Sequence, residues 1–336
     1  MKRTSNGIIS FWFQYKIFLV KKICFVVLYS VLSLGVTHAQ FVSQYSQYMF
    51  AKESFNPAAI AEGDMMHLCG IHRQQWIGMP GAPVDTYLNL SMPFTINKKS
   101  FGAGLAFDNE KMGLFTKQFV TFQGAYKMKL GEGILSLGAN LGAISIGFRG
   151  DSAYIPSGND YHVAVGSDNQ IPTSQVSGMA FDVSLGAYYA TPKWFAGISV
   201  LDVNQPTVHW SETQDTYVGS MWYLTGGCNI PLSNTNITLK PSVLFKTNFV
   251  NYQTDADLLL DFKDKFWGGL AYRLNDALIF MGGIRLSNGL TLGYAFDLPV
   301  TNLITATYGS HELFLTYDFN ISLEKKKNRY KSVRIL

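Results

Sequence analysis

The sequence has few charged residues, few cysteines and no long apolar run beyond its N-terminal region. Asp, Glu, Lys and Arg make up 15% of the 336 residues, against about 25% in an average soluble protein. So few charges disfavour a disordered chain, and they leave the surface of a soluble enzyme short of its usual polar coating. After residue 39 no stretch reaches the roughly 20 apolar residues of a transmembrane helix. What the sequence has instead, 14% aromatic residues and 31 glycines, is typical of a membrane β-barrel.

The motifs of common enzymes are also absent. The sequence contains no GxSxG, no phosphate-binding loop, no HExxH and no CxxC pair. His67 and His72 are five residues apart on an expected strand, so they face opposite sides and are not expected to share a metal. Ser310-His311-Glu312 offers the groups that an outer-membrane lipase requires, but neighbours on a strand point apart, which favours a loop-to-strand junction. We therefore expect no enzymatic activity, no catalytic residues, no cofactor and no metal.

The positive net charge comes from the two ends of the chain. Of the formal +4, residues 1–39 contribute +5 and the residues after Leu323 another +5, so residues 40–323 sum to about −6. The basic pI is therefore no indication of nucleic-acid binding by the body of the protein. The basic tail, residues 321–336, could contact anionic lipid headgroups or an acidic periplasmic partner, or could remain solvated.

The N-terminus has the features of an export signal. A basic stretch is followed by the apolar run 23–36 and by the small residue Ala39, which predicts a secretory signal peptide over residues 1–39, cleaved after Ala39. The alternative is an N-terminal membrane anchor, for which the run is short and lacks a following basic stop. Cleavage would leave Cys69 and Cys228, either paired in an oxidising compartment or present as two unpaired core thiols.

Beyond residue 65 the apolar residues recur at every second position. Between residues 289 and 297, for example, four apolar side chains alternate with Thr291, Gly293 and Ala295. The same period of two recurs around Leu88, Leu105, Val183, Leu239 and Leu315. A strand that is apolar on one side suits either a β-sandwich or a barrel with lipid outside and water inside.

Connection lengths favour the barrel. Short connections alternate with long ones, notably 149–177, 202–216 and 298–311, and this asymmetry is typical of outer-membrane barrels, whose tight turns face the periplasm. A tight turn at 275–276 is an exception at the long end. We predict an all-β fold, a single transmembrane antiparallel β-barrel of outer-membrane type over residues 66–320. Its strands, about 14 in number, are expected at 66–76, 84–94, 101–107, 115–130, 133–148, 178–190, 193–201, 217–230, 236–246, 254–262, 265–274, 277–286, 289–297 and 312–320.

A barrel of this size must contain something. The sheet must close, because an open edge would leave unpaired amides in hydrocarbon. Beyond about 8 strands, side chains alone no longer fill the interior. Water, loops or a plug must therefore occupy it. Residues 40–65 precede the first strand and are either such a plug or an unstructured periplasmic leader.

Several segments, in one order, carry a family resemblance. The first are 44–50 (QYSQYMF), 56–58 (NPA), 73–78 (RQQWIG) and 81–83 (GAP). Later segments extend the match over nearly all of residues 41–320: 239–242 (LKPS) with Lys246, 265–270 (KFWGGL) with Tyr272-Arg273, 293–297 (GYAFD) and 309–312 (GSHE). Together they resemble the PorP/SprF proteins. Two features depart from the family: residues 59–63 delay the glycine that usually follows sooner, and the basic tail runs past Phe319, where many barrels end on an aromatic insertion signal.

The resemblance implies a non-enzymatic component of type IX secretion and gliding motility. Such barrels attach periplasmic ring components, or surface-bound cargo such as adhesins, to the outer membrane. The implied location is the cell outer membrane, multi-pass, with both termini periplasmic after signal cleavage. The implied partners are outer-membrane lipid, periplasmic type IX machinery components and a secreted or surface-anchored cargo protein, with no nucleic acid. Cargo would meet loop 149–177, and the machinery would meet residues 41–65 and 324–336.

The same segments supply the candidate interaction residues. Arg73, Gln75 and Trp76 carry several donors and a large ring near a strand end, so they could pin the leader to the barrel wall. Trp76 could equally belong to the aromatic belt of a membrane protein. Asn56-Pro57 is expected to set a rigid turn. The full set of candidate interaction or plug-pinning residues is Tyr48, Phe50, Asn56, Pro57, Arg73, Gln74, Gln75, Trp76, Pro83, His311 and Glu312.

The alternative function is a diffusion porin for small solutes. A porin shares the barrel but needs an open, charged constriction in its lumen. The expected inward positions are rich in Gly, Ser and Thr, and they also include Asp182, Asp297, Arg273 and Arg285, which could line a channel. Conductance in a planar bilayer distinguishes the two functions.

Overall fold

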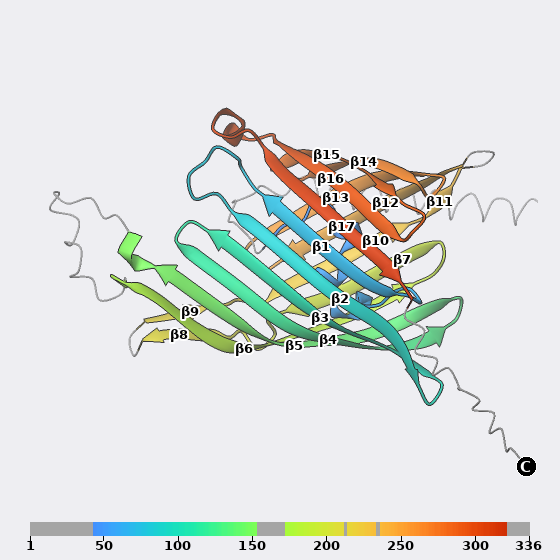
Figure 1. Cartoon of the computed structure of the whole chain (residues 1–336), viewed down its shortest axis with the longest axis horizontal. Coiled ribbons are helices and arrows are strands. Elements are labelled where there is room, and N and C mark those ends of the chain that lie inside the picture. The colour runs from blue at the N-terminus through green and yellow to red at the C-terminus, as the bar shows by residue number, and fades with distance from the viewer. Residues whose placement is uncertain (1–42, 153–171, 212–213, 233–235, 321–336) are drawn as a thin grey trace, which may run out of the picture. The chain divides into compact units, whose positions relative to one another are not determined.

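The computed structural model describes residues 43–152, 172–211, 214–232 and 236–320. Fourteen strands form a closed antiparallel barrel (Figure 1), which confirms the predicted fold class. The predicted signal peptide, the centre of loop 149–177 and the basic tail lie outside the described residues. The barrel strands are β1 (Met66–Gln74), β2 (Val84–Ile96), β3 (Lys99–Met112), β4 (Phe115–Leu130), β5 (Gly133–Arg149), β6 (Gln175–Ala190), β7 (Trp194–Leu201), β10 (Met221–Cys228), β12 (Ile237–Thr247), β13 (Tyr252–Phe262), β14 (Phe266–Arg273), β15 (Ala277–Arg285), β16 (Leu290–Pro299) and β17 (Ser310–Phe319).

Strand pairing closes the sheet. Each strand pairs with its neighbour along the chain, β1 pairs with β17 and β10 pairs with β12. The short strand β11 (Ile230–Pro231) extends the edge of β12. The described barrel strands therefore form a closed ring, as a membrane-spanning sheet requires.

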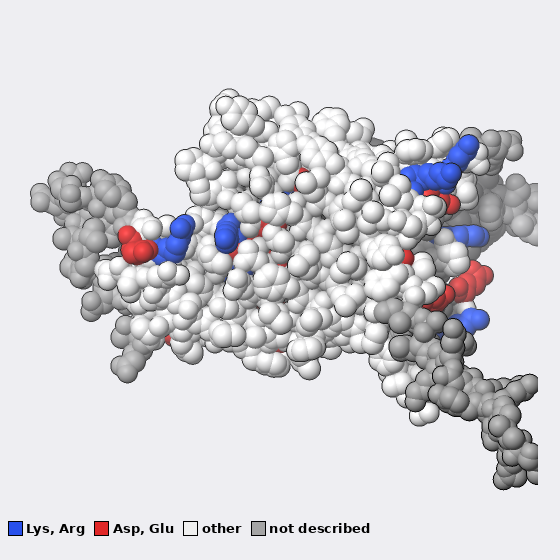
Figure 2. Space-filling view, viewed as in Figure 1, with Lys and Arg blue, Asp and Glu red and all other residues white. Residues whose placement is uncertain are grey.

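The two faces of the wall have opposite chemistry. On β2, Leu88 and Leu90 are exposed, whereas Asp85, Asn89 and Ser91 are buried inside the barrel. The face in Figure 2 carries its Lys, Arg, Asp and Glu side chains toward the two ends, and the wall between them is almost free of charge. The predicted alternation is therefore confirmed. None of the described helices has the length and apolar character needed to cross a membrane.

The connections differ between the two ends of the barrel. The short-turn end, on the right in Figure 1, carries the connections 97–98, 131–132, 191–193, 229–236, 263–265 and 286–289. At one of its tightest turns, Asn97 and Lys98 both have positive φ, as a two-residue hairpin turn requires. Lys263 and Asp264 in the three-residue turn 263–265 also have positive φ. The long-loop end, on the left, carries 75–83, 150–174, 202–220 and 300–309.

The long-loop end has more tight turns than the sequence predicted. Besides 274–276, the connections 113–114 and 248–251 are also tight. The expected end of the third strand at residue 107 is wrong, because β3 continues to Met112. Its last residues keep their register with β4, where Glu110 lies opposite Lys117 and the two side chains form an ion pair at 3.5 Å.

A second correction concerns the expected loop 202–216. It contains a hairpin of β8 (Thr207–Ser211) and β9 (Gln214–Tyr217), which pair with each other and not with the barrel sheet. The strand expected from residue 217 therefore begins only at Met221. The alternating Val208 and Trp210 explain the hairpin, because both side chains pack toward the lumenal Ile144 and Ile146 of β5.

Candidate functional site

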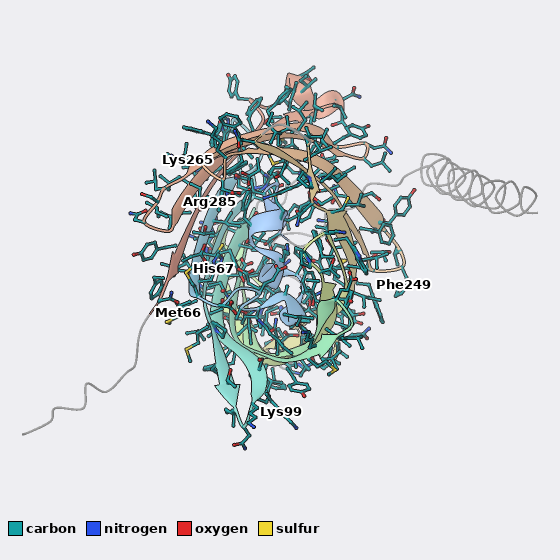
Figure 3. The ribbon with its side chains drawn as sticks, turned by 90° about the vertical axis from the view of Figure 1, so that its right-hand side faces the viewer. Met66, His67, Lys99, Phe249, Lys265 and Arg285 are labelled. Carbon is teal, nitrogen blue, oxygen red and sulfur yellow. The ribbon has the colours of Figure 1, made fainter. Side chains whose placement is uncertain are left out.

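The leader lies inside the barrel and its side chains reach the wall on several sides. We call residues 43–65 the leader; it forms the short 3₁₀ turns η1 (Tyr48–Phe50), η2 (Lys52–Ser54) and η3 (Pro57–Ala59). Figure 3, viewed from the short-turn end, shows these turns enclosed by the ring of strands. Tyr45, Tyr48, Phe55 and Ile60 are all buried among residues of the barrel strands or of the leader itself. The leader, not the wall alone, thus provides much of the interior of this barrel.

Two buried arginines and one aspartate connect three barrel strands inside the barrel, near the long-loop ends of these strands. Arg73 of β1 and Arg273 of β14 both donate to Oδ2 of Asp297 on β16, at 2.6 and 3.0 Å. Arg273 also donates to Asp255 of β13 at 3.0 Å. The Arg73, Arg273 and Asp297 side chains are at most 2% exposed, so water does not screen these pairs.

The leader joins this cluster through its backbone and one hydroxyl. Glu312 of β17 accepts the backbone N–H groups of Ser46 and Gln47 at 2.7 and 2.8 Å. The Ser46 hydroxyl accepts from Arg73 at 2.8 Å and donates to Asp297, also at 2.8 Å. We call the segment 43–50 the anchor, because its backbone position is set by these charged groups of the wall.

Aromatic contacts complete the anchor. The Phe50 ring lies 4.6 Å from both Trp267 and Phe314, centroid to centroid. Gly293 makes room for this group, since a Cβ there would come within 2.5 Å of the Trp267 indole. Tyr48 reaches β12, where its hydroxyl is 3.0 Å from Ser242 Oγ. Desolvation by burial raises the pKa of the Tyr48 hydroxyl well above its ordinary value, so it stays protonated.

The second half of the leader packs against glycines of the barrel wall. Asn56 caps η3 by accepting the N–H of Ala58 at 3.0 Å, and its amide donates to the carbonyl of Ala187 at 3.2 Å. The Pro57-Ala58 backbone lies so close to Gly138 of β5 that a Cβ there would overlap it. Gly186 and Gly197 are equally close to the Asn56 side chain. We call residues 55–61 the seated segment, because it needs a wall without side chains.

The remaining predicted residues lie around the long-loop end of β1. Gln75 is buried and donates to Asp85, which also accepts the hydroxyl of Ser43 in the anchor. The backbone N–H of Trp76 donates to Ser310 Oγ at 3.1 Å. Pro83 lies opposite Gln75 and accepts its backbone N–H. Of the three proposed pinning residues, Arg73 thus contacts the leader directly and Gln75 contacts it through Asp85.

Gln74 and His311 lie on the outer side of the wall. The Gln74 amide contacts the exposed His72 at 3.3 Å, and the His311 ring lies 2.6 Å from the hydroxyl of the exposed Tyr294. Ser310, His311 and Glu312 therefore do not converge, since Glu312 and Ser310 are buried inside the barrel and engaged there.

Sequence reasoning did not connect Arg273 and Asp297 with the leader. Both were interpreted as residues that could line an open channel, yet both bind the anchor or its partners. A signal was present, because an inward arginine and an inward aspartate stood near the family-like segments 265–270 and 293–297. Cys69 and Cys228 are free thiols in the structure, which corresponds to the unpaired alternative.

The hairpin β8–β9 covers part of the lumen at the long-loop end. Val208 is fully buried against Ile144 and Ile146. The Trp210 indole donates to the backbone carbonyl of Ile146 at 2.8 Å and stacks on Phe148 with 5.8 Å between the ring centroids. The interior is therefore occupied by the leader and, at the long-loop end, by this hairpin.

Comparisons with known proteins give matches to solved structures and to one sequence family. The structure is similar to the toluene transporter TbuX of Ralstonia pickettii (12% identity, 81% of this chain and 93% of that chain, TM-score 0.48). It is also similar to a Pseudomonas aeruginosa FadL homologue (12% identity, 79% and 93%, TM-score 0.43). No curated protein sequence matches the chain. The sequence profile described as "Type IX secretion system membrane protein PorP/SprF" matches residues 37–317. Because this profile matches most of the chain, which also forms a barrel of the outer-membrane type, the chain belongs to the PorP/SprF family of type IX secretion system membrane proteins.

Proposed function

We propose that the protein is a closed, non-enzymatic docking barrel of the outer membrane. It would attach periplasmic components of the type IX machinery, secreted surface proteins such as adhesins, or both, to the membrane. The observation that carries this proposal is the fixed leader: Ser46 and Gln47 are held inside the lumen by Glu312, Asp297 and Arg73. A barrel closed in this way offers partners two end surfaces instead of a pore.

The orientation follows from the connections. In outer-membrane barrels the short turns face the periplasm and the longer loops face outward. The end with turns 97–98, 131–132 and 263–265 would then be periplasmic, together with the start of β1 and the end of β17. A signal peptide cleaved after Ala39 would place the mature N-terminus in the same compartment. Machinery would dock at this end, and cargo would dock at loops such as 150–174.

The proposal excludes hydrolysis by Ser310-His311-Glu312. Glu312 binds the leader backbone, and His311 faces the outer side beside Tyr294. Groups on opposite faces of one strand do not form a nucleophile–base pair. We expect His311→Ala to leave secretion and any lipid or peptide hydrolysis in the membrane unchanged.

Conductance tests the closed lumen. The cavity between the leader and the wall near Asp108 and Asp202 has a volume of about 90 Å³, which holds a few waters and is too small for solute flow. Purified protein reconstituted in a planar bilayer should therefore give no steady current. Steady ion current through the native chain would overturn the closed barrel and favour the diffusion porin.

Gene deletion tests docking itself. Deletion should abolish secretion or surface display of the matched cargo, and with it adhesin-dependent gliding. The native gene should restore the function, whereas a gene with residues 150–174 replaced by a Gly-Ser linker should restore the barrel in the membrane but not the cargo at the surface. Intact secretion, adhesin display and gliding in the deletion strain would show that the docking proposal is wrong.

A further inference from the structure

Three potential metal ligands meet where the leader passes the short-turn end of β1. Glu53 belongs to η2 of the leader, and His67 and Cys69 are two residues apart on β1, so both face inward. One ligand atom from each of the three lies within 4.8 Å of the other two. Figure 3 shows His67 at the mouth of the barrel near the leader. A soft sulfur, an imidazole and a carboxylate are thus gathered from two separate parts of the chain.

The carboxylate of Glu53 lacks the partner that its burial requires. The residue is 7% exposed, and its Oε1 has no hydrogen-bond partner among the described residues. A carboxylate in such a place is costly unless it is paired or binds a metal. Desolvation by burial accordingly raises the pKa of Glu53 above its ordinary value. A cation at this position would remove the cost of the unpaired oxygen.

His67 is oriented as metal-binding histidines commonly are. Its Nδ1 lies 2.7 Å from Oδ1 of Asp318 on β17, and the two residues are opposite each other in the β1–β17 register. A carboxylate on one ring nitrogen fixes the ring and leaves the other nitrogen for an ion. Nε2 is therefore the atom that His67 would offer.

From this cluster we propose a zinc site formed by Glu53, His67 and Cys69. Thiolate, imidazole and carboxylate together suit Zn²⁺ better than Mg²⁺ or Ca²⁺, which prefer oxygen ligands. Tetrahedral zinc ligands lie roughly 3.3–3.8 Å apart, given zinc–ligand distances of about 2.0–2.3 Å. The three side chains therefore close in by about 1 Å when the ion binds, and the Cys69 thiol releases its proton to solvent.

The fourth ligand is water. A cavity of about 400 Å³ at this mouth is lined by Glu53, His67 and Asp318, among others. It admits both the ion and a water molecule to the open coordination position. The bound ion joins the leader to β1 by a direct link between η2 and the wall, in addition to the contacts of the anchor. This site does not depend on the docking function.

Zinc titration of the intact mature protein tests the site. Folded protein in detergent is stripped with a chelator and titrated with Zn²⁺, and bound metal is measured by mass spectrometry. The native chain should bind one equivalent. Cys69→Ser and Glu53→Gln should weaken binding at least tenfold, in the range seen for loss of metal-site groups. Cys228→Ser and His72→Ala should bind as the native chain does, since neither residue belongs to the cluster.

Cobalt identifies the sulfur. Co²⁺ in place of Zn²⁺ should give a thiolate-to-metal charge-transfer band in the native chain and in Cys228→Ser, and no such band in Cys69→Ser. Heat-modifiable migration of the barrel shows which variants are folded, and the isosteric Glu53→Gln tests the site if Cys69→Ser does not fold. No zinc bound by the native chain, or equal binding by folded Glu53→Gln, would overturn the proposal.

Discussion

The two halves of the leader are held in opposite ways. The anchor, residues 43–50, depends on charged partners, with Glu312, Asp297 and Arg73 grouped around Ser46. The seated segment, residues 55–61, depends on the absence of side chains along β5, β6 and β7. One half needs a few specific groups in the wall, and the other needs an empty surface. The barrel wall therefore holds the anchor by electrostatic attraction and the seated segment by close packing.

The difference has energetic consequences. Removal of one partner from a buried ion pair leaves the other charged and unsolvated, which costs about 3–5 kcal/mol. An extra methyl group in a packed interface forces small shifts and costs about 1–3 kcal/mol. Substitutions in the anchor should therefore be more damaging than substitutions under the seated segment, and the two should respond differently to salt.

The largest expected effect is that of Arg73→Ala. The substitution removes donors from Asp297, Glu312 and Ser46, which remain buried. We expect the free energy of unfolding to fall by about 3–5 kcal/mol, as measured by denaturant titration of the detergent-solubilised barrel with tryptophan fluorescence.

The control is Arg149→Ala. Arg149 is exposed, and among the described residues its side chain donates one long bond, 3.4 Å, to the carbonyl of Gly113, so its removal should cost less than about 0.5 kcal/mol. Equal losses for the two arginines would mean that the buried cluster does not hold the anchor, and the comparison between the halves would fail.

A smaller effect is expected from Gly138→Ala, which adds one Cβ where the backbone of Pro57 and Ala58 lies. Backbone atoms cannot move aside as a flexible side chain can, so we expect a loss of about 1–3 kcal/mol. Protease cleavage near residue 57 should also become faster as the seated segment lifts from the wall.

Gly124→Ala is the matched control on the neighbouring strand β4. A Cβ at Gly124 meets nothing within 4 Å, and the residue faces outward. The added methyl should leave stability unchanged, or raise it by a few tenths of a kcal/mol through the unfolded chain. If Gly124→Ala lowered the free energy of unfolding as much as Gly138→Ala does, the cost would come from strand geometry and not from contact with the leader.

Asn56→Ala should cost about 1–2 kcal/mol, because it removes a helix cap and leaves the carbonyl of Ala187 without its donor. Asn56→Ser separates the two roles, since serine can still cap but cannot reach the strand carbonyl. In equilibrium unfolding the serine variant should lie between the native chain and the alanine variant. Identical values for serine and alanine would show that capping contributes nothing.

The sequence predicted the strands of the barrel wall far better than the contacts of the residues that fill the lumen. Alternation at positions such as Leu88 and Asn89 reports directly on the two faces of a strand, and all the barrel strands followed from it. The resemblance pointed to Arg73 and Glu312 as candidates. Their partners could not be derived, because Arg73 and Asp297 are 224 positions apart in sequence, and only closure of the barrel brings them together.

The glycines that contact the seated segment also could not be identified from the sequence. Gly138, Gly186 and Gly197 fit the expected small, inward-facing positions, but nothing in a strand pattern says which small residue serves a water-filled lumen and which accommodates another segment. The hairpin β8–β9 was missed for a related reason. Its pattern is short, and its burial depends on Ile144 and Ile146, which lie on a distant strand.

The smallest effect concerns Lys52, which lies between the two halves. Its ammonium group is 2.9 Å from Glu62 and 2.8 Å from the Tyr188 hydroxyl, and 4.2 Å from the centre of the Phe195 ring. The Glu62 side chain is 44% exposed, so solvent screens the pair, and Lys52→Ala should cost about 0.5–1 kcal/mol.

Salt should separate this pair from the buried cluster. The Debye length, beyond which salt screens exposed charges from each other, is about 10 Å at 0.1 M and about 3 Å at 1 M ionic strength. Buried pairs are screened much less. In unfolding titrations at both salt concentrations, the loss in free energy of unfolding caused by Lys52→Ala should be smaller at high salt, where mainly its cation–π contribution remains. The loss caused by Arg73→Ala should be the same at both. If both costs fell together, the anchor cluster would have to be open to water, and attraction would then hold the anchor only as weakly as it holds the exposed pair.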